Sequence, residues 1–174
     1  MKRDYIEFQD HSKPLAYLIT IRCYGTWLHG DERGSMNRRA FNVYGTPKIS
    51  PKPGLKNSDT SRLKSLPIKL GIKERKIVEE AIKEVCSYRG YALIAVNART
   101  NHVHIVVSAN IKPEPIMNSF KSYATRKLRK ESLRQTVKIW SRHGSTKYLW
   151  TEENINAAVD YVQYSQGDDA FELS

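Results

Sequence analysis

The stretch Tyr91–Ala109, YALIAVNARTNHVHIVVSA, decides how this chain folds. It contains two apolar, β-branched runs, Tyr91–Ala98 and His102–Ala109, separated by the short polar segment Arg99-Thr100-Asn101. Runs of this composition joined by a short polar link are typical of two antiparallel strands. The sequence therefore predicts a β-hairpin near the middle of the chain.

The segments on either side of this hairpin alternate between strand-like and helical patterns. The predicted elements are a strand in Pro14–Cys23, a helix over Lys73–Arg89 stopped by Gly90, the hairpin, a helix from Lys112, a strand in Val137–Trp150 that contains a Gly144-Ser145 turn, and a helix from Ile155 to about Gln166. This order predicts an α+β fold, a ferredoxin-like antiparallel sheet covered by helices, with one more helix at its C-terminal end. At 174 residues we expect a single domain, 1–174.

A long irregular segment, 25–67, follows the first predicted strand, and 168–174 is an acidic tail. Loops as long as 25–67 are uncommon inside compact domains and are often functional. No run approaches the roughly 20 apolar residues of a membrane-spanning helix, and the N-terminus lacks the apolar core of a signal peptide. We therefore expect a cytoplasmic protein with no membrane partner, in which Cys23 and Cys86 are buried thiols.

The net charge is strongly positive and unevenly distributed. The chain carries 29 lysines and arginines against 18 acidic residues, a formal net charge of +11. Residues 112–150 hold ten basic and two acidic side chains, whereas 151–174 holds six acidic side chains and no basic ones. This charge favours polyanionic partners, chiefly nucleic acid, although a solvated helix face produces the same local pattern.

The pair His102 and His104 is the sharpest feature of the sequence. Alternate residues of a strand point to the same face, so the two imidazoles are expected to project together, opposite to Val103 and Ile105. Two neighbouring imidazoles are good ligands for a divalent cation, with two ordinary strand histidines as the alternative. The last helix offers Tyr161 as a nucleophile, but from the residues alone a core tyrosine is the preferred interpretation.

These features together resemble the single-tyrosine HUH transposases, the family of IS200-like and REP-associated tyrosine transposases, and its REP-associated branch in particular. The resemblance covers about residues 15–167 and is carried by Arg22–Gly34 (RCYGTWLHGDERG), Asn101–Val107 (NHVHIVV), Lys121–Arg126 (KSYATR), Gly144–Trp150 (GSTKYLW) and Ala158–Gly167 (AVDYVQYSQG). A histidine-hydrophobic-histidine motif alone is a weak signal. Together with a tyrosine-bearing last helix in a short basic chain it is much more specific.

The resemblance implies a ferredoxin-like, metal-dependent enzyme of DNA transposition and recombination. Such an enzyme cleaves single-stranded DNA, typically beside a small hairpin, and transfers the strand through a 5′-phosphotyrosine intermediate. His102 and His104 match the family's ligands for Mg2+ or Mn2+, and Tyr161 matches its nucleophile, with Tyr123 and Tyr164 as rivals. No small-molecule cofactor is implied, and a monomer or a homodimer is expected.

The third metal ligand departs from the family pattern. In IS200-like members a glutamine follows the tyrosine by four residues, but here that position is Ser165. Gln163 and Gln166 stand two and five residues after Tyr161. We predict Gln166 as the ligand, with Gln163 as the alternative. Five residues turn a regular helix by about 500°, so Gln166 requires the helix to loosen at its end.

The expected DNA contacts are basic side chains of the helix from Lys112 and of segment 25–67, namely Lys121, Arg126, Lys127, Arg129, Lys130, Arg33, Arg38 and Arg39. Two other functions stay open at this point. A non-catalytic protein that binds structured nucleic acid would use the same fold and charge. A structural metal protein would use the histidine pair alone.

Overall fold

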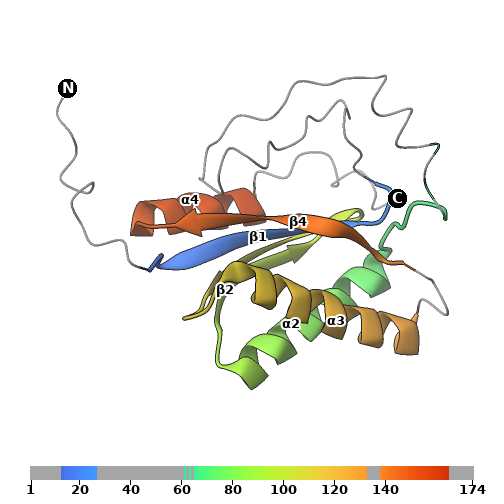
Figure 1. Cartoon of the computed structure of the whole chain (residues 1–174), viewed down its shortest axis with the longest axis horizontal. Coiled ribbons are helices and arrows are strands. Elements are labelled where there is room, and N and C mark those ends of the chain that lie inside the picture. The colour runs from blue at the N-terminus through green and yellow to red at the C-terminus, as the bar shows by residue number, and fades with distance from the viewer. Residues whose placement is uncertain (1–12, 27–60, 62, 64, 133–137, 165–174) are drawn as a thin grey trace.

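Figure 1 shows the chain as a computed structural model, which describes residues 13–26, 61, 63, 65–132 and 138–164. The elements follow one another in the order β1 (Ala16–Cys23), α2 (Ile72–Arg89), β2 (Ala92–Ala98), β3 (His102–Ser108), α3 (Pro113–Glu131), β4 (Trp140–Leu149) and α4 (Glu152–Gln163). This order confirms the predicted one. Most of segment 25–67 and the whole of 168–174 lie outside the described residues, and so do Gln166, Arg33, Arg38 and Arg39. None of the described helices is long and apolar enough to cross a membrane.

The four strands form one antiparallel sheet in the order β2-β3-β1-β4. The central pair is β1 and β3, in which Thr20 lies opposite His104 and Arg22 opposite His102. At the turn of the predicted hairpin, the Arg99 N–H donates to the His102 carbonyl at 2.8 Å. This strand order and direction confirm the predicted ferredoxin-like arrangement.

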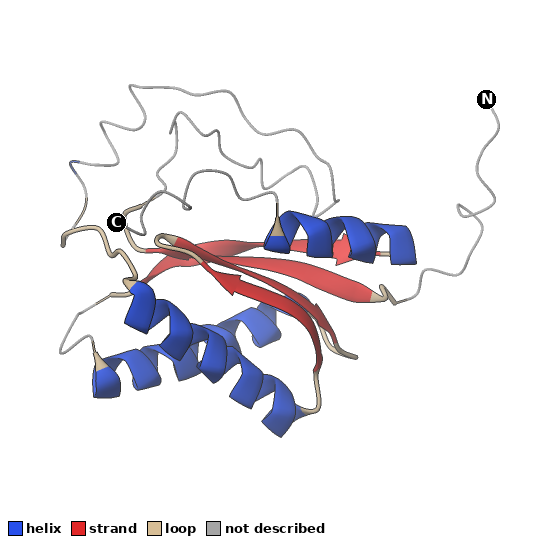
Figure 2. Cartoon of the chain, turned by 180° about the vertical axis from the view of Figure 1, so that it is seen from behind, coloured by secondary structure: helices blue, strands red, loops and turns tan. Residues whose placement is uncertain are grey.

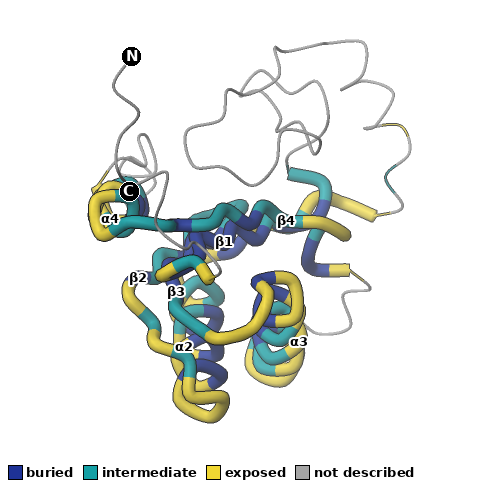
Figure 3. Tube along the Cα trace, turned by 60° about the vertical axis from the view of Figure 1, so that its left-hand side comes forward, coloured by how far each residue is buried: buried dark blue, intermediate teal, exposed yellow. Residues whose placement is uncertain are grey.

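Helices cover both faces of this sheet: α2 and α3 pack on one face and α4 on the other (Figures 2 and 3). The larger core joins odd-numbered residues of β1 and β3 to the α2–α3 side, and its fully buried members include Ile19, Ile105, Ile82 and Phe120. The smaller core joins even-numbered residues to α4, through Ala16, Leu18, Val106, Ala158 and Val162. The alternation that builds both cores therefore directs the even-numbered residues of β3 toward the α4 side.

Two helix boundaries show the capping chemistry that the sequence indicates. α2 ends before Gly90, which adopts a left-handed φ of 70° and donates its N–H to the Cys86 carbonyl. α4 follows Thr151, whose side chain accepts a hydrogen bond from the Asn154 N–H at 3.1 Å. Because this cap satisfies a free N–H of the first turn, the helix begins at Glu152, earlier than predicted.

The predicted turn at Gly144-Ser145 is wrong. β4 continues through both residues, with Gly144 paired to Ile21 and Ser145 paired to Thr20. A Cβ atom at Gly144 would lie 2.4 Å from the Thr20 carbonyl oxygen and 2.5 Å from Met117 Sδ. The close approach of β1 and α3 therefore requires glycine at this position of an unbroken strand.

The two cysteines are free and buried, as predicted. Burial raises the pKa of the Cys23 thiol to about 12 and that of Cys86 to about 11. Both side chains therefore stay protonated at neutral pH and belong to the core.

Candidate active site

His102 and His104 project from the same face of β3, as their spacing predicts, and this is the face covered by α4. Val103 and Ile105 alternate with them and are fully buried in the core on the other face. The centroids of the two imidazole rings lie 4.6 Å apart, with an interplanar angle of 69°. His104 is buried and His102, at the start of the strand, is half-buried. The strand therefore brings two imidazoles together at the edge of the smaller core.

Each imidazole is held by a hydrogen bond at Nδ1. Thr20, opposite His104 in the central strand pair, places its Oγ1 2.8 Å from His104 Nδ1. Asn101 places its Oδ1 2.5 Å from His102 Nδ1. Because Nδ1 of each ring is engaged inside the protein, a cation held by this pair would be ligated through Nε2 of each ring.

Helix α4 brings Tyr161 to the histidine pair within the same chain. Ala158 and Val162 seat the helix in the smaller core, and the Asn97 side-chain amide of β2 donates to the Val162 carbonyl at 2.8 Å. The Tyr161 ring then packs edge-on against His104, with 5.2 Å between ring centroids and an interplanar angle of 66°. The three predicted residues from β3 and α4 thus form one cluster.

The two rival tyrosines lie elsewhere. Tyr123 belongs to α3, on the opposite side of the sheet, where the Arg126 guanidinium stands 4.3 Å from the centre of its ring. Tyr164 directly follows α4 and is 79% exposed. Of the three tyrosines, Tyr161 is the one whose ring packs against His104.

The histidine pair fits two of the ligands of a divalent cation. Within the described parts of the chain, no three His, Cys, Asp or Glu side chains gather in a way that suits a metal ion. Gln163 is the last residue of α4 and is exposed, whereas Gln166 lies outside the described residues. Within the described residues, the histidine pair therefore offers two imidazole nitrogens to a divalent cation.

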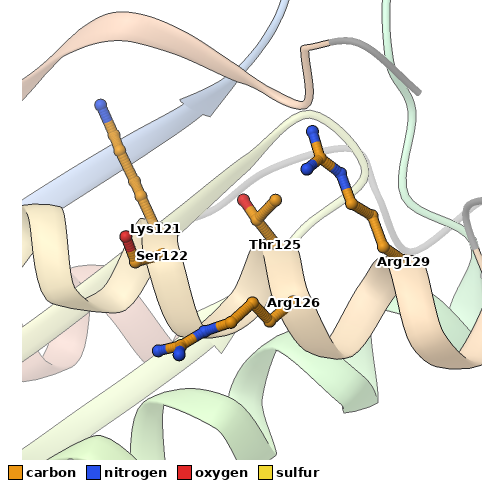
Figure 4. A pocket seen from close by; sticks show the side chains of 5 residues that line it. All are labelled: Lys121, Ser122, Thr125, Arg126 and Arg129. Atoms are coloured by element: carbon orange, nitrogen blue, oxygen red, sulfur yellow. The ribbon is translucent and has the colours of Figure 1, made fainter. Parts of the chain in front are cut away.

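The predicted basic residues of α3 include three that surround a pocket. Lys121, Arg126 and Arg129 line an open pocket of about 520 Å³, together with Ser122 and Thr125. Figure 4 shows Lys121 and Arg129 rising from the same side of α3, while Arg126 extends from another side of the helix. This pocket is built on α3, which covers the face of the sheet opposite to α4 (Figure 1).

Two of the predicted contact residues also make internal contacts. Lys127 Nζ lies 2.5 Å from Glu84 Oε1 and 3.8 Å from Glu80 Oε2, and the hydrogen bond to Glu84 raises the pKa of Lys127. This lysine therefore joins α3 to α2. Lys130, by contrast, is exposed.

Lys121 joins α3 to β4. Its Nζ donates hydrogen bonds to the carbonyls of Ser141 at 3.0 Å and Arg142 at 3.4 Å. Burial, with a smaller effect from Lys138, lowers the pKa of Lys121 from 10.5 to about 8. Lys121 therefore serves both the pocket and the attachment of the edge strand.

Three polar residues hold this cluster although no local sequence pattern predicts their role: Thr20, Asn97 and Asn101. Thr20 and Asn97 stand in mainly apolar strands, AYLITIRC and ALIAVNA. An isolated polar residue in such a strand is the only sequence signal that it has a specific partner. Their partners His104 and Val162 are far away in the sequence, so the signal alone does not identify what they hold.

The structure thus combines a histidine pair on a ferredoxin-like sheet with a tyrosine on the helix that covers this face. The family model described as "Transposase IS200 like" matches residues 69–164, more than half of the chain. The chain therefore belongs to the IS200-like transposase family.

Two solved structures are similar to this chain. One is a REP-associated tyrosine transposase bound to a REP hairpin, with 11% sequence identity and a TM-score of 0.47, covering 86% of this chain and 65% of its own. The other is a candidate transposase from Deinococcus radiodurans R1, with 10% identity and a TM-score of 0.46, covering 94% of this chain and 96% of its own. The chain thus spans just under two thirds of the first protein. No curated protein matches the sequence.

Proposed function

We propose that this chain cleaves single-stranded DNA beside a hairpin and transfers the strand through a covalent link to Tyr161. The observation that carries the proposal is that the Tyr161 ring packs against His104, which in turn lies beside His102, within one chain. The membership of the IS200-like transposase family supports DNA as the substrate. The hairpin-bound REP-associated transposase is the relative that suggests a hairpin beside the cleaved strand, and with it the REP-associated branch.

In the proposed reaction the Tyr161 Oη attacks the phosphorus of one phosphodiester. The new Oη–P bond replaces the bond from phosphorus to the 3′ oxygen, which leaves as a free 3′-OH. The phenol proton is lost from Tyr161 and the 3′ oxygen gains one, so no proton is consumed overall. A 3′-OH of a second strand then attacks the phosphotyrosine, and Tyr161 recovers its proton. The energy of the phosphodiester is kept in the covalent link, so no nucleotide cofactor is required.

The residues proposed to hold Mg2+ or Mn2+ are His102 and His104, with Gln166 as the third ligand and Gln163 as its alternative. A divalent cation at this position supplies charge stabilisation to the phosphoryl oxygens. The chain's own part is to fix two imidazoles at the edge of a buried cluster and to hold Tyr161 beside them.

The DNA backbone is proposed to contact basic side chains outside this cluster. The pocket lined by Lys121, Arg126 and Arg129 offers cationic groups close together. Lys127, Lys130 and the arginines Arg33, Arg38 and Arg39 complete the proposed set. DNA binding through contacts of this kind weakens as the salt concentration rises.

Incubation with hairpin-bearing oligonucleotides and Mg2+ or Mn2+ tests the proposal. We expect a protein–DNA adduct that survives denaturing electrophoresis, carries the 5′ phosphate and disappears in Tyr161→Phe and His102→Ala. The matched controls are Tyr164→Phe, three residues away, and Tyr123→Phe on the opposite side of the sheet, which should retain the adduct. Salt-dependent binding without an adduct under any of these conditions would instead establish the non-catalytic nucleic-acid-binding function.

A further inference from the structure

We propose that Thr20 and Asn101 are positioning residues that fix the tautomer and ring orientation of the two histidines, so that both rings present Nε2 to one divalent cation. The inference rests on the metal site of the proposed function and adds two residues to it. It is carried by two hydrogen bonds that meet the same atom, Nδ1, on His104 and His102.

The Asn101 contact favours one tautomer of His102. The amide oxygen Oδ1 accepts hydrogen bonds and cannot donate them, so the proton at this 2.5 Å contact belongs to His102 Nδ1. In a neutral imidazole the lone pair then lies on Nε2, the nitrogen on the other side of the ring. Asn101 therefore selects the tautomer that ligates through Nε2.

Asn101 is itself held in place by the strand beside it. Its backbone carbonyl accepts hydrogen bonds from the Cys23 N–H at 2.9 Å and from the Thr26 hydroxyl at 3.2 Å. These bonds attach the β2–β3 turn to the end of β1. The side chain that orients His102 thus projects from a backbone position fixed by β1.

Thr20 performs the same task for His104 from the neighbouring strand. It is 7% exposed, and its hydroxyl lies in an otherwise apolar stretch of β1, where a buried hydroxyl is unfavourable without a partner. The partner is His104 Nδ1 at 2.8 Å. Ligation of a cation through His104 Nε2 requires the proton on Nδ1, so the Thr20 hydroxyl acts as the acceptor.

The cluster leaves little room for independent ring motion. The two imidazoles are 4.6 Å apart, and Tyr161 packs on His104 from the α4 side. Removing either hydrogen bond removes the preference between the two ring orientations that differ by roughly 180° about χ2, which fill nearly the same space but exchange the positions of Nδ1 and Nε2. We therefore expect loss of either partner to weaken cation binding without removing a ligand.

Mn2+ titration followed by electron paramagnetic resonance tests this inference directly. The measurement uses the full chain with Tyr161→Phe, so that no DNA chemistry is involved. We expect Thr20→Val and Asn101→Ala each to weaken Mn2+ binding by about 10-fold. Thr20→Ser and Asn101→Asp keep an acceptor oxygen and should bind within about twofold of the parent.

Thr146→Val provides a matched control. Thr146 of β4 is also 7% exposed, but it pairs with Ile19 of β1, which belongs to the core on the opposite face of the sheet. The same substitution at Thr146 should therefore leave Mn2+ binding unchanged. Thermal unfolding shows whether each variant is folded, and Asn101→Ala carries the test if Thr20→Val does not fold. Equal Mn2+ affinity in the parent and the two variants overturns the positioning role alone. A parent that binds no Mn2+ overturns both this role and the proposed metal site.

Discussion

The Lys121 side chain places an ammonium group where burial opposes its charge. The group is retained because its hydrogen bonds to two carbonyls attach β4 to α3. In the unfolded chain the amine is fully hydrated and titrates at its ordinary pKa, whereas the folded chain lowers that pKa to about 8. Between these two values the unfolded chain binds more protons at Lys121 than the folded chain does.

This difference predicts that the contribution of Lys121 to stability rises with pH between about 8 and 10.5. Relative to Lys121→Met, the free energy of unfolding of the wild type should increase by on the order of 1 kcal/mol from pH 7.5 to 9.5. The increase is smaller than the full pKa shift implies, because the amine is partly exposed. Urea unfolding at a series of pH values measures it.

Lys121→Arg is the control for this prediction, because a guanidinium stays charged throughout the range. Its stability relative to Lys121→Met should not change with pH. A wild type that follows the pH profile of Lys121→Met would contradict a lowered pKa at Lys121.

At the residue scale, the sequence predicts the histidine pair better than it predicts the residues that hold the pair in place. His102 and His104 share a face because they stand two apart on one strand, which is a local rule. The hydrogen bond between Thr20 and His104 joins residues 84 apart and depends on the register of β1 against β3. Nothing within a few residues of Thr20 specifies that register.

Among the elements, α4 is the one that must hold Tyr161 beside the histidine pair of β3. It has 12 residues, of which Ala158 and Val162 are buried, so its apolar contact with the sheet is small. The hydrogen bond from Asn97 to the Val162 carbonyl adds a directional attachment one residue after Tyr161. The last carbonyls of a helix have no partner within it, so Asn97 also satisfies a group that the helix cannot.

Asn97→Ala should therefore loosen the C-terminal turn of α4 without disturbing the rest of the fold. We expect faster amide hydrogen exchange in α4, by about 10-fold, since leaving the Val162 carbonyl unpaired costs roughly 1–2 kcal/mol. The yield of the phosphotyrosine adduct should also fall in Asn97→Ala. Asn97→Asp should behave similarly, because a carboxylate cannot donate to a carbonyl, whereas Asn110→Ala on the exposed segment after β3 should not. Unchanged exchange in α4 of Asn97→Ala would remove Asn97 from this role.

Element boundaries were predictable where local chemistry sets them. Gly90 stops α2 and Thr151 caps α4, and both signals are read from a few neighbouring residues. Gly144 was misread because glycine also serves close backbone approach, and the groups that approach it, the Thr20 carbonyl and Met117, come from elements far away in the sequence. A glycine in a strand-like run therefore marks either a turn or a close backbone contact, and only the tertiary structure distinguishes the two.

At the scale of the whole molecule, the cationic pocket on α3 and the histidine–tyrosine cluster lie on different sides of the sheet. The pocket on α3 belongs to the side of the larger core, and Tyr161 with its histidines belongs to the side of the smaller one. A DNA molecule that contacts both in one chain must therefore pass around an edge of the sheet. The helix α4, which bears the proposed nucleophile Tyr161, has three acidic side chains and no basic one, so it is not itself suited to bind phosphates.

The contact between Tyr161 and His104 bears on whether one chain is enough for the proposed reaction. Tyr161 meets His104 in its own chain, so a site completed in cis needs no helix from a second copy. We therefore predict that an equimolar mixture of Tyr161→Phe and His102→Ala forms no DNA adduct, because every chain in it lacks one half of its own site. The measurement is denaturing electrophoresis with labelled hairpin DNA, with the two variants distinguished by a size tag and each first shown to bind the DNA. In a dimer that exchanges helices, the intact histidines of one variant would meet the intact Tyr161 of the other. An adduct on the His102→Ala chain would therefore contradict the cis site and establish a shared one.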